Sequence, residues 1–553
     1  MKFVRLGVAV LAVACSGQVA RPPDKGQPIG GTGGMDGTPP PAMPPAVPAC
    51  AQDGLPAARL WRLTHTQWRN TLADAFGFTS QVARGFPADA RLDGFANSAD
   101  RLAVSSLLTD YYYRAAEELS ADILRRSGEF LGCAIDQMSG TCLDDFIRSF
   151  AGKAWRRPAT AEDVGKLHKV YDTAAGATDS STGLRMVVEA VVLSPHFLFR
   201  TELGPAGVAP GKVTSLTDHE LASALSYTLW DGPPDAGLLA LAASGKLHQP
   251  DTLLAEAKRL LASPKRAPAA LDSFFQQWLK IDDLADSPKD ATLFPGYSAQ
   301  VAEDLLEENR RFVNGVVFEG DKSLTTLLTS SVGYVNERTA KLYGTNGTGG
   351  DLTRANLDAG QRRGLLTQAA FLAAHADGDS TRLVDRGRFV REEVLCLDVP
   401  PPPAEFKFTD PKITDDMTQR EKLTIHAANP ACASCHVLFD GIGFALEAYD
   451  PIGQFRTLDR GKKIDTTGSL PLPDRPDLKF DDFVGLVDQL AKLPQPYTCF
   501  SSRYLEYATG RSSAQIPSCE LEPLGKVFTK SGYHVDDLIL AVLTSPSFVA
   551  RKN

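Results

Sequence analysis

Apolar side chains recur every three to four residues through most of the chain after Leu60, which is the pattern of amphipathic helices. Helix-capping residues stand at the expected starts of these stretches. Thr64 precedes the first stretch, and Thr160 precedes a later one, with Asp163 three residues on. The pattern predicts a mainly α fold built from several helical bundles.

At 553 residues, the chain is longer than one hydrophobic core usually organises. We predict helical modules at 50–130, 131–204, 213–346, 358–470 and 480–553. In the first, the stripe Leu107, Leu108, Tyr111, Tyr112, Ala115 and Leu119 is typical of core. The helices predicted in the third are Thr217–Trp230, Thr252–Leu261, Ala269–Lys280, Ser298–Phe318 and Asn336–Tyr343. Its carboxylates Glu303, Asp304, Glu307 and Glu308 indicate a solvated face.

Two segments of the chain repeat one pattern. Leu193-Ser194-Pro195-x-Phe197-x-x-Arg200 returns as Leu543-Thr544-Ser545-Pro546-x-Phe548-x-x-Arg551. A basic segment lies about forty residues before each of them. We interpret 480–553 as a divergent copy of 131–204.

The N-terminus indicates export. Lys2 and Arg5 precede the apolar run 6–14, a signal too short to span a bilayer permanently. Residues 1–14 resemble a lipoprotein signal that leaves Cys15 acylated, and plain secretion is the alternative because Ala12 replaces the usual leucine. Residues 15–49 form a predicted Gly/Pro-rich tether, with 15 Gly or Pro among the 29 residues 21–49. The net charge of −9 argues against nucleic-acid binding.

The sequence Cys432-Ala-Ser-Cys435-His436 is the attachment signature of a c-type haem. In that chemistry the two thiols bond to the porphyrin and the imidazole binds the iron. A helix at about 415–428 is predicted to end at Asn429-Pro430, which breaks it immediately before the motif helix. The alternatives are a thioredoxin-type redox pair, a zinc half-site, and two structural cysteines that happen to be close. We predict one covalent haem c.

The remaining cysteines suggest disulfides. After Cys15, Cys432 and Cys435, an even set remains: Cys50, Cys133, Cys142, Cys396, Cys499 and Cys519. Six cysteines in an exported chain allow fifteen pairings. Short sequence separation favours Cys133–Cys142 and Cys499–Cys519, which leaves Cys50–Cys396 by subtraction.

The chain resembles the planctomycete-type cytochrome c multi-module family of exported bacterial proteins, which comprises the domain of unknown function 1592 family and its companion modules. The resemblance runs from Leu60 to Arg551. It rests on ordered matches at Arg62–Thr64, Trp155–Pro158, Leu225–Trp230, Val335–Arg338, Arg363–Gln368, Pro400–Pro403, Cys432–His436, Gly443–Glu447 and Tyr507–Arg511. It implies haem c binding and electron transfer outside the cytoplasm, in a cytochrome-like module near the C-terminus, but no firmly assigned reaction.

The sequence does not identify the second protein ligand of the iron. The methionines are Met1, Met35, Met43, Met138, Met186 and Met417, so none follows His436. The candidates are His375, His426, His534, Met417 or an open site, and we predict His375, in a segment that the family also marks with a histidine. Arginines that could pair with haem propionates are Arg382, Arg386, Arg388 and Arg456.

Three functions are consistent with this sequence. The first is an electron carrier of the bacterial envelope, anchored by lipid alone to the outer membrane or soluble in the periplasm, whose partner is another envelope redox protein. The second is a haem peroxidase or oxygenase acting on an extracellular substrate. The third is a scaffold or binding protein with a vestigial haem site.

Overall fold

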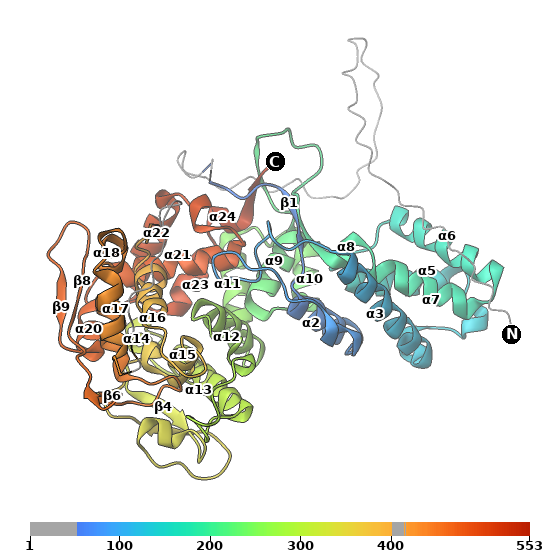
Figure 1. Ribbon diagram of the computed structural model, residues 1–553. Coiled ribbons are helices and arrows are strands. Elements are labelled where there is room, and N and C mark those ends of the chain that lie inside the picture. The colour runs from blue at the N-terminus through green and yellow to red at the C-terminus, as the bar shows by residue number, and fades with distance from the viewer. Residues whose placement is uncertain (1–51, 53, 401–413, 415) are drawn as a thin grey trace. The chain divides into compact units, whose positions relative to one another are not determined.

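The computed structural model describes residue 52, residues 54–400, residue 414 and residues 416–553. Helices dominate these residues, and their strands form two-stranded antiparallel pairs. The chain is therefore mainly α, as predicted (Figure 1). The predicted export signal 1–14 and tether 15–49, with Cys15, Cys50 and Pro401 to Pro403, lie outside the described residues.

The N-terminal part of the described chain has its own hydrophobic core, formed by residues between Leu63 and Leu198 with Tyr227. Its elements are β1 (Arg59–Arg62), α2 (His65–Phe76), η1 (Val82–Gly85), α3 (Ser106–Arg125), α4 (Ser127–Phe130), η2 (Ile135–Gln137), α5 (Gly140–Trp155), α6 (Ala161–Ala177), α7 (Ser180–Val192), α8 (Pro195–Leu198) and β2 (Phe199–Glu202). Capping boxes at Thr64 and Thr160 start α2 and α6, because each hydroxyl accepts a backbone N–H that the helix itself leaves unpaired.

A second hydrophobic core joins Phe95 to residues between Leu216 and Val549. Its first elements are β3 (Val213–Ser215), α9 (Asp218–Trp230), α10 (Ala236–Ala243), α11 (Pro250–Leu261), α12 (Arg266–Trp278), η3 (Leu284–Asp286), α13 (Ala299–Val317), α14 (Leu324–Thr329), β4 (Val332–Val335), η4 (Ala340–Tyr343) and β5 (Thr353–Asn356). The side chain of Tyr227, on α9, packs in the first core, and its hydroxyl oxygen lies 2.7 Å from the hydroxyl oxygen of Thr71. The two cores are thus joined by a buried polar contact.

The part of the chain that carries the Cys-x-x-Cys-His motif contributes residues to the same core before and after the motif helices, up to Leu395 and again from Ile442. Its elements are η5 (Leu365–Thr367), α15 (Ala369–Ala374), α16 (Leu383–Phe389), the π-helical turn η6 (Val390–Val394), α17 (Gln419–Ala427), α18 (Pro430–His436), α19 (Asp440–Ala445), η7 (Leu446–Ala448), β6 (Leu458–Asp459), β7 (Lys462–Lys463), β8 (Gly468–Leu470) and β9 (Leu478–Phe480). The last elements are α20 (Phe483–Leu490), α21 (Gln495–Thr509), η8 (Ser513–Gln515), α22 (Ser518–Lys530), α23 (Val535–Leu543), α24 (Pro546–Val549) and β10 (Ala550–Lys552).

The repeated sequence pattern has the same structure in both places. In each, a helix is followed by a four-residue helix with proline at its first position and then by a strand: α7, α8 and β2 in one, α23, α24 and β10 in the other. The strands pair differently, β2 with β1 and β10 with β3.

An ion cluster joins the two strand pairs. The buried carboxylate of Glu202 on β2 accepts from Arg59 of β1 at 2.8 Å and from Arg551 of β10 at 2.7 Å. Burial alone would raise the pKa of Glu202, but Arg551, Arg59 and Arg200 hold it at about 2. The carboxylate therefore stays charged and fixes the C-terminal strand to the first strand pair.

Some predicted elements differ from the structure. Leu107, assigned to the core stripe of α3, is 54% exposed, and the helix predicted at Asn336–Tyr343 is only the short turn η4. Asn336 instead turns the chain: its side-chain oxygen accepts from the backbone N–H groups of Arg338 and Thr339, both at 3.0 Å. Such side-chain caps compete with the helix.

The predicted solvated face of α13 is wrong at two positions. Asp304 is 7% exposed and pairs with Arg338, and Glu308 is fully buried. The hydroxyl of Tyr343 donates to Glu308 at 2.6 Å. Both partners come from the segment after β4, so the helix periodicity of α13 alone could not reveal the burial.

Glu308 makes the stability of this region depend on pH. Burial raises the pKa of Glu308 to about 7, against the opposing effects of Tyr343 and the Tyr334 N–H. The folded state thus holds a proton that the unfolded state loses near pH 4.5, so this stabilisation is full below pH 4.5 and lost as pH rises through 7.

We expect the free energy of unfolding of the wild type to fall by about 3 kcal/mol across that pH window relative to Glu308→Gln. Urea unfolding at several pH values measures this difference, and the exposed Glu303→Gln is the control. Parallel pH profiles for wild type and Glu308→Gln would contradict the assignment.

Candidate functional site

Two short helices present the Cys-x-x-Cys-His motif. Helix α17 ends at Ala427, and α18 begins at Pro430, which cannot extend the preceding helix. The backbone N–H of Cys432 donates to Asn429 O at 2.9 Å, which starts the new turn. Because Cys432 and Cys435 are three residues apart on α18, their side chains lie on one face of the helix.

Both motif cysteines are free thiols. Cys432 is 8% exposed and Cys435 is half-buried, and neither takes part in a disulfide, although every other described cysteine does. The Cys435 thiol lies 3.9 Å from the backbone oxygen of Pro400. The geometry therefore leaves both sulfur atoms available for bond formation.

The imidazole of His436 is oriented by a carboxylate. Its Nδ1 lies 3.0 and 3.1 Å from the two side-chain oxygens of Asp440, which is 7% exposed at the start of α19. A carboxylate only accepts, so Nδ1 carries the hydrogen and Nε2 keeps its lone pair. A carboxylate held on Nδ1 in this way prepares a histidine to bind a metal through Nε2. Asp440 is absent from the residues that the sequence predicts for the site, although its position four residues after His436 is a signal for it.

His426, at the end of α17, is the histidine that lies beside His436. The two ring centroids are 4.8 Å apart, and Phe439 packs 5.2 Å from His436 on another side. Burial and the nearby His436 lower the pKa of His426. Two apolar side chains next to the histidines are exposed: Ile425 at 37% and Val437 at 57%.

His375 lies in a different environment. It is 8% exposed, its ring packs on Phe371 and Phe389, and its Nε2 donates to the backbone oxygen of Leu279 at 2.9 Å. Burial lowers the pKa of His375 to about 4. These contacts are those of a core histidine. The sixth-ligand role of His375 remains a prediction that this geometry does not favour.

The predicted propionate partners are engaged elsewhere. Arg386 is fully buried and donates to five backbone oxygens: those of Leu372, His375, Leu446, Tyr449 and Asp450. Arg382, Arg388 and Arg456 form ion pairs with Asp385, Glu392 and Glu447 respectively. Arg386 thus holds the chain around α16 together and is not free to bind a ligand.

The structure confirms one predicted disulfide and corrects another. Cys133 and Cys142 are joined, as predicted. Cys499 is joined to Cys396, not to Cys519. Cys396 follows η6, and its Cα lies 5.3 Å from that of Cys499 on α21, a suitable separation for a disulfide. Cys519 is also disulfide-bonded. The pairing Cys50–Cys396 is therefore wrong as well.

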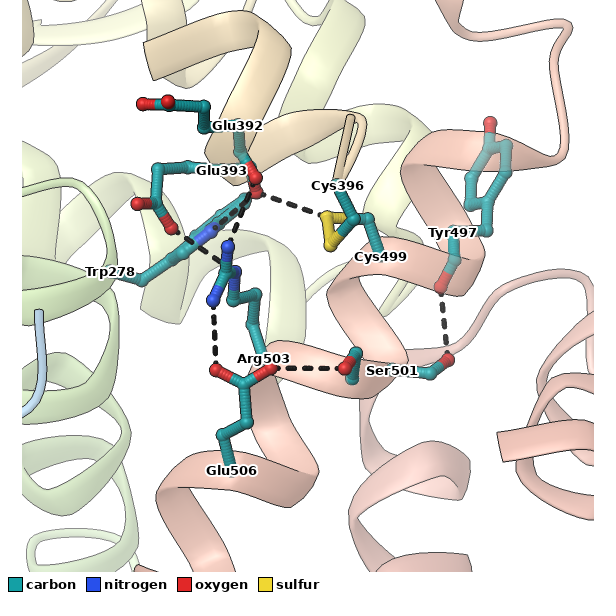
Figure 2. The surroundings of a disulfide bond; sticks show 10 residues. Trp278, Glu392, Glu393, Cys396, Tyr497, Cys499, Ser501, Arg503 and Glu506 are labelled. Atoms are coloured by element: carbon teal, nitrogen blue, oxygen red, sulfur yellow. Dashed lines mark hydrogen bonds and ion pairs between the residues drawn. A yellow bond between two sulfur atoms is a disulfide. The ribbon is translucent and has the colours of Figure 1, made fainter. Parts of the chain in front are cut away.

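A hydrogen-bonded network surrounds the Cys396–Cys499 bond (Figure 2). The indole N–H of Trp278 donates to Glu393 O at 3.1 Å, and the guanidinium of Arg503 donates to Glu392 O at 3.0 Å. Arg503 also pairs with the carboxylates of Glu393 at 3.1 Å and Glu506 at 2.8 Å. The disulfide and these contacts fix the end of η6 to α12 and α21.

Five family models match the chain, and their order follows the sequence. All are described as Protein of unknown function: DUF1587 at 61–125, DUF1595 at 142–202, DUF1592 at 216–345, DUF1588, named PSCyt3, at 362–459, and DUF1585 at 478–548. The PSCyt3 match contains the Cys-x-x-Cys-His motif. No curated protein and no solved structure matches the chain. Within the described residues, no helix is both long and apolar enough to cross a membrane.

Proposed function

Because the chain belongs to the planctomycete cytochrome c-type multi-module families, we propose that it binds one covalent haem c and carries electrons in the cell envelope. The observation that carries this proposal is the donor set on α18. Two free thiols share one helix face, and the neighbouring imidazole has its Nδ1 occupied by Asp440. A zinc site would need a second Cys/His pair at matching spacing, and a thioredoxin-type dithiol would need a βαβ context.

Each residue of the site has a defined part. Cys432 and Cys435 would form the thioether bonds, and His436 would bind the iron through Nε2. Asp440 holds the proton on Nδ1 and fixes the plane of the ring. Bound haem c supplies one-electron chemistry. The protein sets its potential through the second ligand and the surrounding hydrogen bonds.

The second ligand decides between a carrier and an enzyme. His426 is our candidate because its ring lies 4.8 Å from that of His436, whereas the Nε2 of His375 is bonded to Leu279 O. A second histidine saturates the iron, which favours electron transfer over peroxide or dioxygen chemistry.

Carbon monoxide binding tests this choice. We expect the reduced wild-type protein to take up carbon monoxide slowly, because a histidine must first leave the iron. His426→Ala should take it up rapidly, and the matched variant His375→Gln should behave as wild type. Rapid uptake by the wild-type protein would favour the peroxidase or oxygenase alternative. Rapid carbon monoxide uptake by His375→Gln would instead indicate that His375 is the second ligand of the iron.

The proposed envelope location depends on the N-terminal sequence. Lys2, Arg5 and the apolar run before Cys15 support export with a lipid on Cys15, and the electron partner would then be another envelope redox protein. Radiolabelled palmitate should enter the wild-type chain and not Cys15→Ser. Equal labelling of both proteins would rule out Cys15 as the lipid attachment site.

A further inference from the structure

An apolar cavity of about 440 Å³ lies between the helices α11, α21, α22 and α23. This volume is in the range of small-molecule sites. None of its described lining residues belongs to the haem motif. Aliphatic side chains form most of its wall, among them Leu254, Leu505, Leu524, Val527, Leu540 and Ala541.

A second, polar cavity of about 1170 Å³ adjoins the apolar one. Lys258, Asp537 and Leu540 line both cavities, so the two spaces meet at these side chains. From there the polar cavity continues along the start of α12 and one side of α13. A ligand that occupied both spaces would have an apolar part in one and a polar part in the other.

The side chains that such a ligand would contact are accessible, and the helices that carry them are held in place. Val527, on the α22 wall of the apolar cavity, is 43% exposed, and Lys258 is exposed on α11. Helix α22 packs against α21 and α23, and α11 packs against α23. Glu520 of α22 also pairs with Arg511 at 2.8 Å. Fixed walls lower the cost of ordering the site when a ligand binds.

The charges of the polar cavity favour an acidic group. The described residues of its lining carry five cations and three carboxylates. One cation, Lys322, pairs with the lining carboxylate Asp536 at 2.6 Å. The two lining arginines share a single carboxylate, Glu307, which lies outside the lining. The cavity therefore has more cations than carboxylates to offset them.

Two lysines of the polar cavity lack a counter-charge. Lys258, at the junction of the cavities, and Lys265, just before α12, form no ion pair with any described residue. Of the two remaining lining carboxylates, Asp537 lies 3.6 Å from Nδ1 of His534, and Glu319 is exposed. An uncompensated ammonium group at the mouth of an apolar cavity is complementary to an anionic head on an apolar tail.

We propose that the two cavities together bind a single-chain amphiphile with an acidic head group. The alkyl chain would lie between α11, α22 and α23, and the head group would pair with Lys258. Burial of the chain should supply most of the affinity, because an exposed ion pair contributes little. Lys258 would supply the preference for an acidic head. This site would give the protein a binding function independent of the haem.

Calorimetry on the full chain tests the proposal with octanoate, decanoate and dodecanoate below micelle-forming concentrations. We expect saturable binding of dodecanoate and about a fourfold gain in affinity for each added methylene. Dodecyltrimethylammonium, which has the same tail and a cationic head, should bind at least about tenfold more weakly than dodecanoate. Tighter binding of dodecyl phosphate than of dodecanoate would support the proposal with phosphate as the acidic head.

Three variants separate the tail site from the head site. Val527→Asp places a charge on the exposed part of the apolar wall and should weaken dodecanoate binding at least about tenfold. Lys258→Glu should weaken dodecanoate binding to a similar degree, about tenfold, and leave dodecanol binding unchanged. Lys530→Glu, the same charge reversal on an exposed residue of α22 outside both linings, is the matched control and should bind dodecanoate as wild type. Circular dichroism confirms that each variant is folded.

Three results would overturn the proposal. The first is no saturable binding of dodecanoate or dodecyl phosphate to the wild-type chain. The second is binding of dodecyltrimethylammonium as tight as that of dodecanoate. The third is unchanged dodecanoate affinity in both folded cavity variants. None of these results affects the haem proposal, because no described residue of the motif lines either cavity.

Discussion

Replacing both motif cysteines, in Cys432→Ala/Cys435→Ala, should abolish covalent haem and leave the rest of the protein folded. Neither thiol belongs to the two hydrophobic cores, and α18 packs against α17 rather than within a core. Haem attachment, in contrast, needs sulfur at these positions. We expect complete loss of haem stain on a denaturing gel and little change in the circular dichroism spectrum.

The matched control is Cys133→Ala/Cys142→Ala, which removes two other cysteines and should keep the haem stain. Haem that stays covalently bound to Cys432→Ala/Cys435→Ala would contradict the assigned site. Unfolding of that variant would instead show that the motif is needed for the fold.

The second large effect is expected from Cys396→Ala/Cys499→Ala. The disulfide has a sequence separation of 103 residues and encloses the motif helix. Closing a loop of this length restricts the unfolded chain, and its loss should lower the free energy of unfolding by about 4–5 kcal/mol. Cys133 and Cys142 are separated by 9 residues, so their removal should cost only about 2–3 kcal/mol.

Chemical unfolding under non-reducing conditions compares the two double variants. If Cys396→Ala/Cys499→Ala lowers the free energy of unfolding no more than Cys133→Ala/Cys142→Ala does, stabilisation by closure of the long loop is contradicted. Peptide mapping of the wild type gives a direct check, because it should find Cys396 linked to Cys499. A peptide that links Cys499 to Cys519 would restore the pairing favoured by the sequence.

Local chemistry explains which features the sequence predicts well. Thr64 and Thr160 cap helices because the hydroxyl and its backbone partner are three residues apart in the chain. Pro430 ends one helix and begins the next for a similarly local reason. Cys133 and Cys142 pair across a short loop. Each of these features is decided within about ten residues.

Features set by distant parts of the chain were not predictable in this way. Glu308 is buried because Tyr343 and the chain after β4 cover it, although its helix alone suggests exposure. Cys499 meets Cys396, not the nearer Cys519, because η6 packs against α21. His375 lies in a segment where the family also has a histidine. In the fold, however, its ring packs against Phe371 and Phe389.

The sequence predicts the residues that would bind the haem, but it does not predict the residues that orient them. Cys432, Cys435 and His436 follow from a motif of five residues. Asp440, which orients His436, needed the structure to show the two side chains meeting across one helical turn. The proximity of His426 depends on the angle between α17 and α18, which the Asn429-Pro430 break leaves undetermined in the sequence.

The central claim is one covalent haem c on His436 and the two motif thiols. The most direct test is a pyridine haemochrome assay on full-length protein matured with a c-type cytochrome assembly system, quantified per chain. The proposal predicts one haem c per chain that survives denaturation and acid–acetone extraction. A protein that is fully matured and folded but carries no covalent haem would contradict it.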